Sequence, residues 1–170
     1  MNTHNHPPAA GEVVEEVIHV EAEIEDRIEV LVLPATGETA LLELIRSKLE
    51  LTDEHHFFER DHDEPFRHHA HGRKHIRVVG HRCHEVTVKV RYEHDTKDHH
   101  FKPSGTVFKA LQWAIGKHAF NLDPTQAAKA NLILPGADQP LPREDVIGKY
   151  VKAGHCALVV DLTLKDFTNG

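Results

Sequence analysis

The sequence predicts an α+β protein made of two repeated units, each with the order strand, strand, helix, strand, strand. Apolar and polar residues alternate near the start of each unit, which is the period of a half-buried strand. After each pair of alternating segments, apolar residues recur three and four positions apart, as on one face of a helix. The same order restarts after residue 82, so the pattern is an internal repeat of about 70 to 80 residues.

The first unit is expected to span residues 12–82. It follows a tail at residues 1–11 that is short of large apolar side chains and is expected to be disordered. Pro34 ends the second strand, because proline cannot donate to a ladder. The elements expected are strands at 16–24 and 28–33, a helix carrying Leu41 to Leu49, a short strand around 57–58, a His-rich loop at 67–75 and a closing strand at 76–79.

The second unit is expected to span residues 85–162, with a flexible tail at 163–170. Ser104 or Thr106 is suited to cap its helix. The elements expected are strands at 86–91 and 99–102 around a polar turn at 95–98, a helix over 107–115, a strand at 131–134, a loop at 141–150 and a final strand at 157–162.

Composition excludes several classes of function. The chain has 170 residues and a formal charge of −7, which argues against nucleic-acid binding, since such binding rests mainly on phosphate neutralisation. No apolar run reaches the length of a membrane-spanning helix, and the first residues lack the pattern of a secretory signal. We therefore expect a soluble, cytoplasmic protein without membrane or nucleic-acid partners.

Three segments of the second unit resemble ubiquitin. Pro103-Ser104-Gly105-Thr106-Val107 resembles the start of the ubiquitin helix, the segment 130–136 resembles the strand and turn after it, and Leu158-Val159-Val160-Asp161-Leu162 resembles the closing strand. The first unit matches in outline. The whole chain is similar to the bacterial tandem ubiquitin-like modifiers, which are encoded beside E1-like, E2-like and JAB-peptidase-like enzymes in antiviral defence operons. This resemblance implies two tandem β-grasp domains.

The resemblance also implies a function. An E1-like enzyme would activate the carboxylate of Gly170, and an E2-like enzyme would pass the chain to an amine on a target protein. A JAB-like peptidase would remove it. The modifier itself would be no enzyme and would need no cofactor. By the same match, Ile133, Ala157 and Val159 would lie together on the solvent face of the second sheet and offer a surface to partners. The alternative is that these three residues belong to the core.

The last residues depart from ubiquitin, since they read Lys165 to Gly170 without the Arg-rich Gly-Gly ending. This departure leaves open a different class of function, a tandem ubiquitin-like adaptor that binds partners without being conjugated. A sulfur-carrier role is a weaker alternative, because those related proteins usually end in Gly-Gly and have one domain.

The histidines and cysteines suggest two further alternatives. His71, His75 and Cys83 have types and spacing that could contribute to a zinc site, although no paired-cysteine motif accompanies them. Cys83 also has His81 and His84 as neighbours, as a catalytic thiol would need, although a small unit has little room for a cleft. The other cysteine, Cys156, is expected to be a small core residue.

Overall fold

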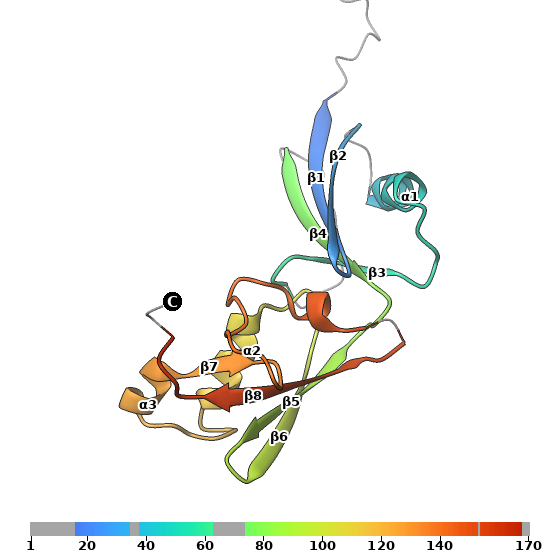
Figure 1. Ribbon diagram of the computed structural model, residues 1–170. Helices are drawn as coiled ribbons and strands as arrows, with labels where there is room; N and C mark the ends of the chain where they lie inside the picture. The colour runs from blue at the N-terminus through green and yellow to red at the C-terminus, as the bar shows by residue number, and fades with distance from the viewer. Residues whose placement is uncertain (1–15, 35–37, 63–73, 153, 168–170) are drawn as a thin grey trace, which may run out of the picture.

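A computed structural model describes residues 16–34, 38–62, 74–152 and 154–167, and it contains two four-stranded sheets that follow one another along the chain (Figure 1). The strand orders are β2-β1-β4-β3 and β6-β5-β8-β7. In both sheets the first and last strands of the unit pair in parallel at the centre, and the other pairs are antiparallel. One helix packs across each sheet. The predicted fold class, two tandem ubiquitin-like β-grasp domains, is confirmed.

The first domain buries one face of its sheet under α1. Its elements are β1 (Val17–Ile24), β2 (Arg27–Pro34), α1 (Glu38–Lys48), β3 (His56–Glu59) and β4 (His75–His81). The alternation in β1 places Ile18, Val20 and Ala22 on the inner face, where none of them is exposed. Leu41 and Ile45, four positions apart on α1, cover them.

The second domain repeats this arrangement with longer connections. Its elements are β5 (Val86–Tyr92), β6 (Asp95–Phe101), α2 (Val107–Ile115), α3 (Pro124–Lys129), β7 (Asn131–Ile133), the 3₁₀ turn η1 (Ile147–Tyr150) and β8 (Ala157–Thr163). The hydroxyl of Thr106 caps α2 by accepting from the backbone N–H of Lys109. Val88 and Val90 face Leu111 across the core.

Each domain opens with a hairpin whose turn has two residues, and Glu25 and Glu93 adopt a positive φ in these turns. The second turn corrects the expected polar turn at 95–98. Asp95 pairs directly with Tyr92, so residues 95–98 belong to β6. Their polarity misled the prediction because β6 is an edge strand, where one face remains in water and apolar side chains are not required.

The edge strand β2 is apolar on both faces. Leu33 is buried on the inner face, whereas Ile28, Val30 and Val32 stand on the outer face and are 59%, 70% and 57% exposed. Within the described residues β2 pairs only with β1. The run of apolar residues from 30 to 33 marks this two-sided character, which alternation alone does not reveal.

Candidate functional site

The outer face of the second sheet carries the predicted docking residues. Alternate residues of β8 point away from α2, so Ala157 and Val159 both stand on this face, and Val159 is 38% exposed. Ile133 is half-buried on β7, opposite Asp161 and diagonal to Val159. The three side chains therefore share one face. That they bind a partner stays a prediction.

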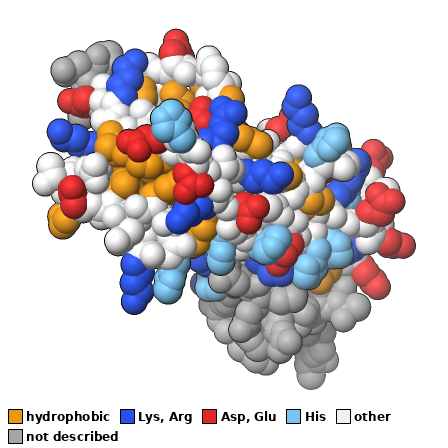
Figure 2. Space-filling model, turned by 90° about the horizontal axis from the view of Figure 1, so that it is seen from below, with side chains coloured by type: hydrophobic (Ala, Val, Ile, Leu, Met, Phe, Trp, Pro, Cys, Tyr) orange, Lys and Arg blue, Asp and Glu red, His pale blue; other side chains and the backbone are white. Residues whose placement is uncertain are grey.

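Charged groups border the apolar strip that Ile133, Ala157 and Val159 form. On β5, Lys89 lies opposite Val159, and Arg91 lies opposite Asp161. The Arg91 guanidinium donates two hydrogen bonds to the Asp161 carboxylate, at 2.6 and 3.0 Å. This bidentate pair holds the charges of Arg91 and Asp161 in place on one side of the strip. Lys89 is exposed beside Val159. Figure 2, seen from below relative to Figure 1, shows hydrophobic side chains gathered among charged ones on the face that it draws.

The chain leaves the second sheet at Thr163, the last residue of β8, which pairs with Asn131. Leu164 still packs against the second core. Beyond it, the backbone N–H of Lys165 donates to the Thr163 hydroxyl at 3.1 Å, and the Lys165 ammonium lies 5.5 Å from the centre of the Phe167 ring. Gly170 lies outside the described residues.

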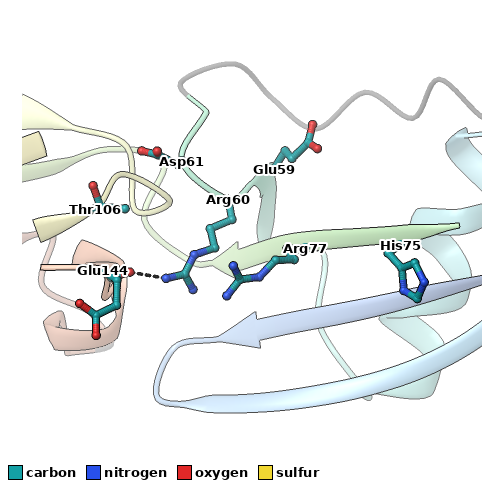
Figure 3. A pocket seen from close by; sticks show the side chains of 7 residues that line it. All are labelled: Glu59, Arg60, Asp61, His75, Arg77, Thr106 and Glu144. Atoms are coloured by element: carbon teal, nitrogen blue, oxygen red, sulfur yellow. Dashed lines mark hydrogen bonds between the residues drawn. The ribbon is translucent and has the colours of Figure 1, made fainter. Parts of the chain in front are cut away.

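Polar contacts join the two domains at the end of β3 (Figure 3). Arg60, directly after β3, donates to the Glu23 carboxylate on β1 at 2.6 Å and to the backbone carbonyl of Glu144 in the second domain. The N–H of Asp61 donates to the Ser104 carbonyl at 2.9 Å, and the Ser104 hydroxyl donates to the carbonyl of the next residue of the first domain, His62, at 2.8 Å. These bonds hold the end of β3 against the loop that precedes α2.

Arg60 is nearly enclosed, whereas its neighbour in Figure 3 is not. The Arg60 and Glu23 side chains are 13% and 10% exposed. Arg77 on β4 makes a similar pair with Glu21 at 3.2 Å, but these side chains are 54% and 36% exposed. The two pairs thus place the same chemistry in a mostly buried and in an exposed setting. Nothing in the local sequence around Arg60 or Arg77 signals this difference, because it depends on how the second domain covers the first sheet.

The cysteines form a disulfide between Cys83, in the segment between the domains, and Cys156, immediately before β8. This corrects two expectations. Cys83 has no free thiol to ligate a metal or to act as a nucleophile, and Cys156 is an exposed cross-link rather than a core residue. Disulfides persist mainly in oxidising compartments, so the cytoplasmic location gains no support from this bond.

The other metal candidates are not brought together in the described part of the chain. The His75 ring stacks on the ring of His19 from the neighbouring strand, with centroids 5.0 Å apart. His71 lies outside the described residues, as do most of the expected loop at 67–75 and the tail at 1–11. Within the described ranges, no three His, Cys, Asp or Glu side chains are placed to hold one ion.

Comparisons with known proteins agree with the geometry of the second domain. Residues 87–165 match a family model described as BilA ubiquitin-like domain 2. The matched segment runs from β5 to just beyond β8, and so contains Ile133, Ala157 and Val159. BilA comes from bacterial ubiquitin-like systems.

The remaining comparisons add little. No curated protein matches the chain. Among solved structures, one match is the solution structure of the N-terminal ubiquitin-like domain in the 4931431F19Rik protein, with 14% identity and a TM-score of 0.36 over 51% of this chain and 81% of that one. Across the described residues, no helix is both long and apolar enough to cross a membrane.

Proposed function

We propose that this chain is a ubiquitin-like protein modifier of a bacterial conjugation system that acts in antiviral defence. The observation that carries the proposal is the match of residues 87–165 to BilA ubiquitin-like domain 2. The exposed strip of the second sheet supports it, because a modifier needs a surface on which its enzymes dock. The fold itself is one of non-catalytic modifiers and adaptors.

The chemistry is supplied by the partner enzymes. The Gly170 carboxylate attacks the α-phosphate of ATP on an E1-like enzyme, which forms an acyl adenylate and releases pyrophosphate. An enzyme thiolate then displaces AMP, and a thioester forms. After transfer to an E2-like enzyme, a target amine attacks the thioester carbonyl and expels the thiolate, which leaves an amide bond. A JAB-like peptidase would hydrolyse that amide. Gly170 suits this role because it has no side chain to obstruct a narrow catalytic channel.

Conjugation tests the role of Gly170. The chain, its E1-like and E2-like enzymes, ATP and a target are expected to give an adduct on a denaturing gel, and deletion of Gly170 is expected to abolish it. The matched control is Gly170→Ala, which keeps the carboxylate in place and adds only a methyl group, so it should retain more adduct than the deletion. Equal conjugation by the deleted chain would contradict the proposal.

The docking face gives a second prediction. Val159→Arg is expected to lower kcat/KM for thioester formation by about tenfold or more, because a charge replaces a central apolar contact. The control is Val30→Arg, an equivalent change at a more exposed valine of the first domain, which should leave this step unchanged. If both variants are activated like the native chain, E1 does not dock on the second sheet.

The alternative is a tandem adaptor that is never conjugated. The hydrogen bonds between the domains favour it, since they give the two units one shared surface. It predicts that a chain ending at Phe167, which keeps all of β8 and Leu164, functions fully. Loss of function in that chain supports the modifier instead.

A further inference from the structure

The strongest unexplained feature of the molecule is a histidine buried between the domains. His81 is the last residue of β4, where the chain passes toward the second domain, and none of its surface is exposed. The backbone N–H of Cys83 donates to its Nδ1 at 2.9 Å, and its Nε2 lies 3.0 Å from the carbonyl oxygen of Gly148 in η1. The ring therefore bonds to both the connecting segment and the second domain.

These two partners define the protonation state of the ring. A backbone N–H can only donate, so Nδ1 accepts and carries no proton. A carbonyl can only accept, so Nε2 carries the proton and donates it to Gly148. The imidazole is thus neutral and both nitrogens are used. A second proton on Nδ1 would face the Cys83 N–H, break that bond and bury a charge.

The surroundings of the ring do not offset this cost. Burial is the largest effect and lowers the pKa of His81, while the Gly148 carbonyl and Glu25 oppose the shift and His55 and Arg82 add to it. The Glu25 carboxylate is itself held by Arg82 at 3.5 Å. From the second domain the facing groups are uncharged, since Gly148 and Pro103 pack there. In that domain, the ammonium of Lys149 is paired with Asp145, and that of Lys102 with Glu85 and the ring of His84.

The close approach of Gly148 makes the ring position matter. A Cβ added at this glycine would lie 2.8 Å from Cδ2 of His81 and 3.0 Å from Pro103. The 3₁₀ turn η1 therefore rests directly on the imidazole, and a side chain at position 148 has no space unless the ring or the turn moves.

We propose that His81 is a pH-operated latch between the two domains: the neutral ring holds η1 against the first sheet, and protonation releases the second domain while both sheets stay folded. In the docked state, η1 rests against the first sheet. The contribution of His81 to the stability of this state is complete above pH 6.5, the ordinary pKa of a histidine, and is lost as the pH falls below that value toward the lowered pKa of the docked ring. The ratio of open to docked chains rises by up to tenfold per pH unit, and by at most about thirtyfold between pH 8 and pH 5.

Small-angle X-ray scattering of the full chain from pH 8 to pH 5 tests the latch, with far-ultraviolet circular dichroism to follow the sheets. The radius of gyration is expected to increase below pH 6.5 with the dichroism unchanged. His81→Gln should remove this pH dependence, whatever its degree of docking. The control is His55→Gln, because His55 is also buried with a pKa lowered by burial. It lies within the first domain and acts on His81 only through charge, so its loss should shift the transition and not abolish it.

Two further measurements make the result decisive. Gly148→Ala should open the chain already at pH 8, because its methyl group would collide with the ring. In the native chain, NMR should show His81 protonated at Nε2 alone at pH 8 and titrating together with the increase in size. A constant size over the whole pH range, an unaltered transition in His81→Gln, or a His81 ring that titrates at an ordinary pKa would each overturn the proposal.

Discussion

Breaking the Cys83–Cys156 disulfide is expected to lower the free energy of unfolding of the second domain by about 4 kcal/mol, because the bond closes a long loop in the unfolded chain. The two cysteines are 73 positions apart and bracket almost the whole domain. Without the bond, the unfolded chain gains the entropy of the open loop, whereas the folded core keeps its contacts. Urea unfolding with and without a dithiol reductant measures the difference.

Trp113 is the only tryptophan of the chain and packs against the second core, so its fluorescence reports on this domain alone. The control is the double variant Cys83→Ala and Cys156→Ala, in which the reductant should change nothing and the midpoint should equal that of the reduced native chain. A native chain whose Trp113 transition is the same in both conditions would show that the bond does not stabilise the fold.

Arg60→Ala is expected to destabilise the protein by about 3 kcal/mol, because it leaves the Glu23 carboxylate in a mostly buried site without its partner. The variant also removes the bond to the Glu144 carbonyl, so it weakens the contact between the domains. Chemical denaturation followed by circular dichroism measures the loss.

The chain supplies a matched control for this change. Arg77→Ala removes the equivalent but exposed pair with Glu21 and should cost less than about 1 kcal/mol. Adding Glu23→Gln to Arg60→Ala should recover part of the stability, since the unpaired charge is then gone. Equal losses at Arg60 and Arg77 would mean that burial at the domain contact has no energetic effect.

The regular parts of the fold could be predicted because their signal is local. The alternation of β1 and β5 and the helical spacing of α2 each reflect one buried face, and one face is enough to fix a period. The strand β6 was shortened in the prediction, since its outward residues are polar. The outer face of β2 was not foreseen, because Ile28, Val30 and Val32 have the same spacing whether they face the core or the solvent.

Contacts between distant segments could not be predicted. The pairing of Cys83 with Cys156 depends on where β8 enters the sheet, and neither cysteine carries a sign of it in its local sequence. The burial of Glu23, Arg60 and His81 depends on the docking of two domains that the sequence describes only separately. The shared face of Ile133, Ala157 and Val159 was expected from the resemblance to ubiquitin, and the strand register places the three residues on one face.

If the Gly170 carboxylate becomes joined to a target amine, mass spectrometry of a trypsin-digested adduct reveals the new bond itself. Trypsin cuts after Lys165, so we expect a target lysine that carries the branch Asp166-Phe167-Thr168-Asn169-Gly170 in amide linkage. A target that is bound and active but carries no such branch, or a branch joined through any other residue of this chain, would contradict it.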